Sequence, residues 1–252
     1  MLARLVVTAM SVVLWTGMTA ALEPAPLRVC MLSGSEEYES DKTLESLRVE
    51  LETKHGAKVV LLKARGVDKL PGLEALETCD VAVFFTRRLT ISGEPLEQVK
   101  RYVGHGRPIV GIRTASHGFQ NWLEFDPLVL GGNYKGHFGR DKVMTTSIAA
   151  TAKDHPILRG VGAIESTSTL YKAAPLREDC ELLLNGTTAD STQPVAWTTK
   201  HNGGRVFYTS LGGQEDFENP RFRRMLINAI FWASGREAPK PTPTSSPNPK
   251  QD

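Results

Sequence analysis

A polar cluster that directly follows a short apolar run is the first place in this sequence where chemistry could be located. The run Ile109–Ile112 begins after Pro108 and predicts a short buried strand. The polar residues that follow it at once are Arg113, Thr114, Ser116 and His117. In an open parallel sheet, ligands bind beyond the carboxyl ends of the strands. A cation, two hydroxyls and an imidazole would therefore stand where a ligand binds.

Each of these side chains also has a purely structural interpretation. Arg113 could clamp a carboxylate, a phosphate or sugar hydroxyls, or it could pair with an acidic side chain such as Glu37. Ser116 could be a nucleophile, but the elbow signature G-x-S-x-G requires a glycine where Thr114 stands. We therefore favour Ser116 as a cap of a following helix.

Histidines and tyrosines in neighbouring loops could complete a site. His137 lies in the segment Gly131–Gly139, whose four glycines favour a loop that folds back toward the elbow. His117 and His137 are the candidates for proton transfer near neutral pH. Tyrosine rings next to polar groups suit the faces of sugars, although ordinary core packing explains such rings equally well.

We predict one pocket from these segments, because each follows an apolar strand or is rich enough in glycine to fold over the sheet edge. The predicted catalytic residues are His137, His117 and Arg113. The predicted substrate-binding residues are Ser35, Glu37, Tyr38, Arg87, Thr114, Asn133, Tyr134 and Tyr171. Of Arg87 and Arg88, one is expected in the pocket and the other in solvent. No glycine-rich phosphate loop precedes a helix, so a neutral or weakly anionic sugar is favoured over a polyphosphate.

The elements that must position these residues alternate between strand and helix. Nearly continuous apolar runs predict strands at 27–33, 57–62, 80–85 and 109–112, and amphipathic segments predict helices from Asp41, over 94–103 and over 119–128. Further strands are predicted within 142–150, 181–184, 194–197 and 205–209, with a hairpin turn at 201–204 and a last helix over 220–233. This alternation predicts an α/β fold whose central sheet is mostly parallel and covered on both faces.

The composition and the ends of the chain narrow the function further. With 252 residues, 40% hydrophobic, and a net charge of +2, the chain can form one domain and shows no basic excess for nucleic acid. Residues 1–21 have the pattern of a secretory signal peptide, residues 22–236 form the domain, and the Pro-rich residues 237–252 form a disordered tail. We therefore expect export to the periplasm or the extracellular space, with no stable membrane insertion after cleavage, and the alternative is that residues 1–21 are retained as an anchor.

Thiol and metal chemistry are weakly indicated. Cys30, Cys79 and Cys180 are interpreted as buried free thiols, and the sequence alone does not say whether two of them pair. No Cys-x-x-Cys or His/Cys cluster is present. His117, His137, Glu37 and Glu215 leave a divalent metal such as zinc open, but we predict no metal site and leave the cofactor undefined.

Several segments together resemble the ThuA-like (trehalose utilisation) family of the class I glutamine-amidotransferase-like superfamily. They are "VGHGRPIVGIRTASHGF", "GGNYKGHFG", "DHPILRGV", "STLYK" and the ending "PVAWTTKHNGGRVFYTSLGGQEDFENPRFRRMLINAIFWA". The resemblance implies a flavodoxin-like three-layer sandwich and a role in saccharide utilisation. Two positions depart from it: Arg113 stands where an amidotransferase has its cysteine, and Gly213 stands where the family's "SLG" motif is typically followed by histidine.

Three functions follow as alternatives. The first is an exported enzyme acting on a sugar or an oxidised disaccharide, and the second is a carbohydrate-binding module without activity. The third is an amide or ester hydrolase that uses Ser116. Glutamine amidotransferase activity is disfavoured because the elbow lacks its nucleophile. The expected partner is a small carbohydrate, and an oligomer is left open.

Overall fold

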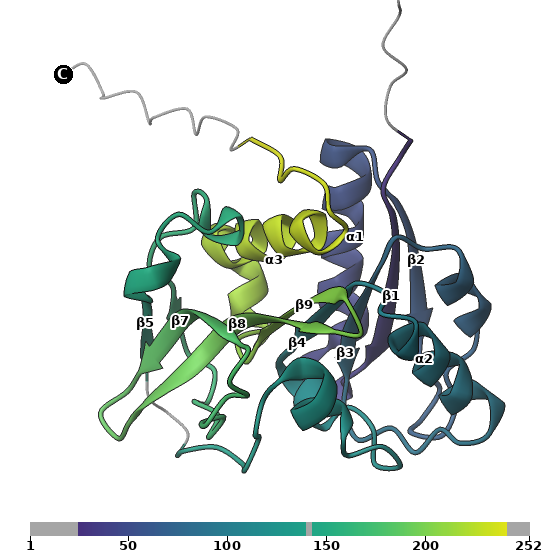
Figure 1. The fold of residues 1–252 in the computed structure, drawn as a ribbon, viewed down its shortest axis with the longest axis horizontal. Coiled ribbons are helices and arrows are strands. Elements are labelled where there is room, and N and C mark those ends of the chain that lie inside the picture. The colour runs from purple at the N-terminus through teal and green to yellow at the C-terminus, as the bar shows by residue number, and fades with distance from the viewer. Residues whose placement is uncertain (1–24, 140–142, 241–252) are drawn as a thin grey trace, which may run out of the picture.

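The computed structural model describes residues 25–139 and 143–240, which form one mixed sheet of nine strands with helices packed on it (Figure 1). The strand order is β2-β1-β3-β4-β9-β8-β7-β5-β6. In this order, the strands are β2 (Lys58–Lys63), β1 (Arg28–Gly34), β3 (Val81–Thr86), β4 (Ile109–Ile112), β9 (Gly204–Thr209), β8 (Thr192–His201), β7 (Glu181–Thr187), β5 (Met144–Ile148) and β6 (Glu165–Ser166).

The sheet is parallel in one half only, so the prediction of a mostly parallel sheet, and with it the flavodoxin-like sandwich, is not confirmed. From β2 to β9, the four neighbouring pairs are all parallel. From β9 to β6, the four pairs are all antiparallel. The predicted hairpin at 201–204 is confirmed, and it starts this antiparallel half. β4 lies inside the sheet with β3 and β9 as neighbours, as the sequence predicts.

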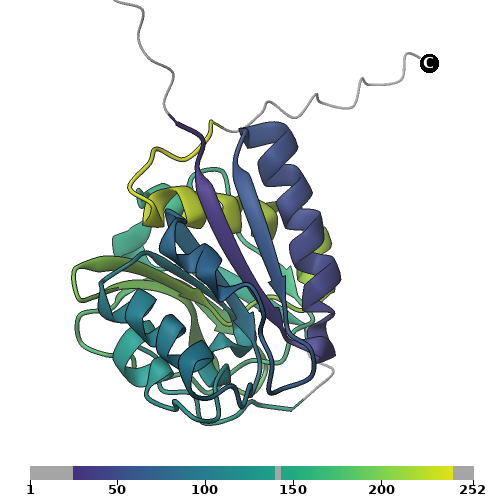
Figure 2. The same ribbon diagram turned by 90° about the vertical axis from the view of Figure 1, so that its right-hand side faces the viewer.

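Helices cover both faces of the sheet because alternate strand residues are apolar on each side. Val29 and Met31 of β1 belong to a core with α1 (Ser40–His55) and α3 (Pro220–Ala233). Cys30 and Leu32, one residue out of step, belong to a second core with α2 (Glu94–Gly104). Figures 1 and 2 show α1 and α3 on one side of the sheet and α2 on the other.

The helix predicted over 119–128 is wrong. A 3-10 turn over Arg113–His117 precedes this segment, and the segment itself contains only the start of a single π-helical turn, Phe125–Leu130. The reason is that the chain between them bonds to the loop after β3: Gln120 N–H donates to the Leu89 carbonyl at 2.8 Å, and Asn121 Nδ2 donates to the Thr90 carbonyl at 3.0 Å. These bonds fix the elbow against the neighbouring loop.

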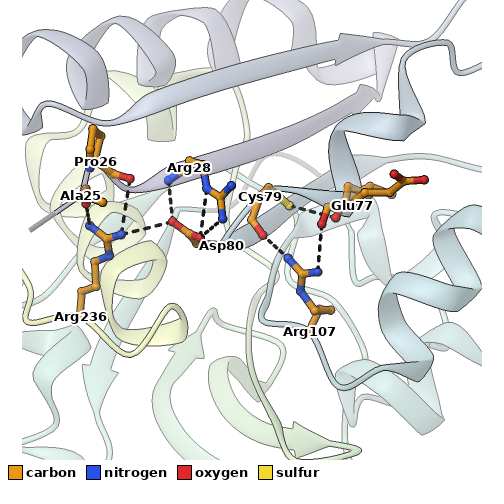
Figure 3. A network of polar contacts seen from close by, with 9 residues as sticks. Ala25, Pro26, Arg28, Glu77, Cys79, Asp80, Arg107 and Arg236 are labelled. Atoms are coloured by element: carbon orange, nitrogen blue, oxygen red, sulfur yellow. Dashed lines mark hydrogen bonds and ion pairs between the residues drawn. The ribbon is translucent and has the colours of Figure 1, made fainter.

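An ion-pair network closes the opposite edge of the sheet, at the amino ends of β1 and β3 (Figure 3). The Asp80 carboxylate accepts from the Arg28 guanidinium at 2.9 Å and from the Arg236 guanidinium at 3.3 Å. The Arg107 guanidinium donates to the carbonyls of Glu77 and Cys79. These contacts tie the two ends of the domain together, away from the elbow.

The predicted signal peptide lies outside the described residues, as does most of the predicted tail. Within the described part of the chain, no helix combines the length and apolarity needed to cross a bilayer. All three cysteines are free, with Cys30 and Cys79 buried and Cys180 partly buried.

Candidate functional site

The elbow after β4 is a strained turn. Arg113 has a φ of 44°, which is unusual for a residue that is not glycine. The surrounding contacts hold this conformation, because the Tyr208 hydroxyl donates to the Arg113 carbonyl at 2.6 Å and the preceding Ile112 pairs with Thr209 of β9. A strained residue between a buried strand and a helical turn is the geometry of a nucleophile elbow. Here an arginine occupies it.

The Arg113 guanidinium is held by neutral groups. It is 1% exposed and donates to the Ser210 carbonyl at 2.7 Å, the Thr169 hydroxyl at 3.0 Å and the Tyr38 hydroxyl at 3.2 Å. The rings of Tyr38 and Tyr171 lie 4.5 and 4.7 Å from its central carbon. The alternative ion pair with Glu37 does not form, since Glu37 pairs with Arg87 at 2.8 Å.

His117 extends this aromatic wall. Its ring is stacked on Tyr134 with centroids 4.5 Å apart, and the Tyr134 and Tyr171 centroids are 4.6 Å apart. Nδ1 of His117 lies 3.2 Å from the Ser116 hydroxyl, which leaves Nε2 to contact a ligand. Burial and the nearby charges of Arg88, Arg87 and Arg113 lower the pKa of His117 to about 3. The imidazole is therefore neutral at physiological pH.

A cavity of about 410 Å³ opens in front of these side chains. Its volume is within the range of roughly 300–1,000 Å³ that ligand pockets occupy. Its lining comprises Glu37, Tyr38, Arg87, Arg88, Arg113, His117, Tyr134, His137, Thr167, Ser168, Thr169, Tyr171, Gly213, Gln214 and Glu215. Polar and charged groups of both signs thus surround a wall of rings.

Comparison with known proteins settles the family. The sequence model of the ThuA family, described as trehalose utilisation, matches residues 28–233. The chain belongs to the ThuA family. No curated protein sequence matches it.

Solved structures show the same fold at low identity. A ThuA-like protein of Bacteroides uniformis has a TM-score of 0.67 at 17% identity, over 86% of this chain and 95% of that one. One of Parabacteroides merdae has a TM-score of 0.68 at 15% identity, over 86% and 94%. A glutamine amidotransferase of Thermotoga maritima has a TM-score of 0.51 at 12% identity, over 82% and 97%. This ThuA protein therefore has the amidotransferase-like fold that its sequence resembles.

Eight of the eleven predicted site residues of this ThuA protein line the cavity, and three do not. Ser35 and Thr114 are buried, with the Thr114 hydroxyl donating to that of Ser35 at 3.0 Å. Asn133 donates to the Ala174 carbonyl at 3.4 Å and lines a neighbouring hollow with Ser116. His137 is exposed at the rim, with Nδ1 2.8 Å from the Phe138 carbonyl.

Two segments of the ThuA cavity are absent from the predicted pocket, although the sequence analysis considers Glu215 as a metal ligand and Gly213 as a departure from the family motif. They are 167–169, in the connection after β6, and 213–215, in the loop after β9. The second had a signal, because β9 is parallel to β4 and must end at the same edge. The first follows β6, a strand of two residues that the sequence does not predict, and its signal was the "STLYK" segment of the family resemblance.

The prediction that Ser116 caps a helix is wrong. Ser116 lies inside the 3-10 turn, and its hydroxyl is 3.3 Å from the Arg113 carbonyl.

Behind the wall of rings, Asp126 is 5% exposed. Its Oδ2 accepts from the Tyr134 N–H at 2.8 Å, while Oδ1 has no hydrogen-bond partner. Burial raises the pKa of Asp126 to about 6.

Glycine at position 213 leaves room for the Ser168 side chain. A Cβ there would lie 2.5 Å from the Ser168 hydroxyl oxygen. That hydroxyl and the N–H groups of Gly212 and Gly213 all donate to Asp216 Oδ2, at 2.8, 2.7 and 2.9 Å. Among the described residues, no group of three or more His, Cys, Asp or Glu side chains lies close enough to hold a metal ion.

Proposed function

We propose that this ThuA protein binds or acts on a small carbohydrate in the cavity beside Arg113, as part of saccharide utilisation. The family's described role in trehalose utilisation supports a sugar ligand. The observation that carries the proposal is the wall of rings, in which Tyr134 and His117 are partly exposed and the buried Tyr171 packs beside them. Ring faces bind the C–H surfaces of sugars. The carboxylates of Glu37 and Glu215 and the guanidinium of Arg87 lie around that wall and can bond to hydroxyls.

We propose that the site does not hydrolyse glutamine through a cysteine nucleophile. Arg113 occupies the elbow, and none of the three cysteines lines the cavity. With its pKa lowered to about 3, His117 stays neutral and can hydrogen-bond to a sugar hydroxyl through Nε2, but, contrary to the sequence prediction, it does not titrate near neutral pH. His137, at the rim, is then the candidate for proton transfer.

The serine hydrolase alternative has one observation in its favour, the 3.2 Å contact between Ser116 Oγ and His117 Nδ1. Against it, Ser116 is 8% exposed and lies outside the residues that line the cavity. A histidine whose pKa is about 3 is also a poor base for activating a serine. We therefore place the carbohydrate function first.

Calorimetric titration of the mature protein with glucose, trehalose and other neutral or oxidised disaccharides tests the proposal. We expect one of these sugars to bind, and Tyr134→Ala to weaken that binding about tenfold, because it removes a stacking surface. Trp122→Ala is the matched control, since Trp122 is partly buried and lies outside the cavity lining. Absence of binding by every sugar, or equal losses in both variants, would contradict the proposal.

The distinction between enzyme and binding module needs a second assay. Proton NMR of the bound sugar over time would show new signals if the protein is an enzyme, and His117→Gln or His137→Gln should then stop their appearance. His105→Gln, after α2, is the control. A sugar that binds and never changes would assign the binding module.

We also propose that the protein is exported, on the pattern of residues 1–21. The mature chain should begin near Leu22. Amino-terminal sequencing of the native protein that returned Met1 would overturn this proposal.

A further inference from the structure

The three arginines that line the cavity differ in the groups that their guanidinium side chains contact. Arg87 forms an ion pair with Glu37. Arg113 is buried among neutral acceptors. Arg88 is exposed, and none of the ion pairs between described residues includes it. Arg88 is therefore the cavity arginine that is both accessible and without an acidic partner in the described chain.

The position of Arg88 is fixed by the fold. Its φ is 50°, and its N–H donates to the His117 carbonyl at 2.8 Å. The next residue, Leu89, donates its N–H to the Gly118 carbonyl at 2.8 Å. Two backbone hydrogen bonds thus hold the segment that carries Arg88 against the elbow. A surface arginine on a free loop would lack such bonds.

The charge of Arg88 acts on the ring wall. Burial lowers the pKa of His117 most, and the charge of Arg88 is the next largest effect. Burial raises the pKa of Tyr134, and the charge of Arg88 is the largest effect in the opposite direction. The charge of Arg88 therefore acts on both of these stacked rings.

The acidic residues of the lining do not balance these cations. Three arginines and two glutamates line the cavity, so the lining has one more cation than it has carboxylates, and the buried Asp216 carboxylate behind Gly213 acts on Arg113. Glu37 is bonded to Arg87, and Glu215 accepts from the Thr167 hydroxyl. A concave site with an excess of one charge concentrates ligands of the opposite charge.

We infer that the cavity selects an acidic saccharide, whose anionic oxygen group binds Arg88 while its ring lies on the partly exposed ring of Tyr134. This inference rests on the proposed carbohydrate function and narrows it. A planar guanidinium holds a carboxylate or a phosphate through paired, charge-assisted hydrogen bonds. The anion is therefore the carboxylate of a sugar acid or the phosphate of a sugar phosphate.

Three ligands that differ only at C6 separate these sources: glucose, glucuronate and glucose 6-phosphate. We expect one acidic ligand to bind about tenfold or more tightly than glucose by calorimetry, because a charge-assisted hydrogen bond is gained. The better of the two identifies the anion. Arg88→Gln should remove the advantage. Arg101→Gln, which removes the same charge from exposed α2, should keep it.

Equal binding of glucose and both acids, or equal behaviour of the two variants, overturns the inference and leaves the carbohydrate proposal intact. Acetate and inorganic phosphate complete the design. If either binds as tightly as the sugar acids and depends on Arg88, the anion site is upheld and the carbohydrate proposal fails. If no ligand binds, both fail.

Discussion

Replacing Arg113 tests whether this arginine is a structural centre of the site as well as its cation. In Arg113→Ala, the protein loses three hydrogen bonds, and the buried Ser210 carbonyl loses the donor that bonds it from the guanidinium. The contacts with the two tyrosine rings are lost as well. The substitution therefore removes the group that joins the elbow to the loops carrying Tyr38 and Thr169.

Two opposing effects determine how much the Arg113→Ala substitution changes the free energy of unfolding. Hydrogen bonds from a charged donor contribute about 1.5–3 kcal/mol each. Burying a cation without a carboxylate costs several kcal/mol, and the variant is relieved of that cost. We expect a net loss of about 2–4 kcal/mol in the free energy of unfolding.

A second variant at the same position isolates the backbone. Because the φ of residue 113 is 44°, Arg113→Gly should be more stable than Arg113→Ala by about 1 kcal/mol. Urea unfolding followed by tryptophan fluorescence gives both values, and Arg101→Ala on exposed α2 should leave the midpoint nearly unchanged. The reasoning is refuted if Arg113→Ala unfolds at the wild-type midpoint, or if the glycine variant is the less stable of the two.

Three further predictions concern single groups. The NMR signals of the His117 ring should not titrate between about pH 5 and 8, because its pKa is about 3; a midpoint near the usual value of about 6.5 would contradict this. Asp126 has a raised pKa of about 6, so its stabilising effect is present below the unfolded pKa of about 3.9 and is lost as the pH rises through 6. Asp126→Asn should therefore gain stability relative to wild type between pH 4 and 8 in thermal unfolding, and a constant difference would be the contrary result. Cys30 and Cys79 are buried, so a thiol reagent should label them only after unfolding, and rapid labelling of the native protein would show that they are accessible.

The parallel half of the fold could be predicted because its signals are local. The segment 80–85 is a short, nearly continuous apolar run, as expected for a strand covered on both faces, and all six residues of β3 are buried. The antiparallel half depends on which strands meet, and this is decided by contacts distant in sequence. β7 and β5, for example, are more than thirty residues apart and pair through a connection that no short motif describes. The segment 119–128 has a helical pattern, yet its bonds to Leu89 and Thr90 override that preference.

The candidate site divides in the same way. Loops that follow parallel strands must meet at one edge, which is why Glu37, Arg87 and Arg113 could be placed together. Which of two adjacent arginines lacks an acidic partner depends on side-chain positions, and no sequence pattern ranks Arg88 above Arg87. The burial of Arg113 between two rings could not be predicted either, because Tyr171 belongs to a connection that is distant from Arg113 in the sequence.

Backbone strain gives a separate argument that these arginines serve function. Among the described residues, four that are not glycine have a positive φ: Glu39, Arg88, Arg113 and Asn202. Asn202 lies in the hairpin turn, where such angles are required, and Glu39 precedes α1. The other two are arginines that line one cavity. Glycine would relieve about 1 kcal/mol or more at each position, but it would remove the guanidinium. Two arginines in strained backbone conformations line the same cavity. This is expected if their positive charges are needed to bind a ligand.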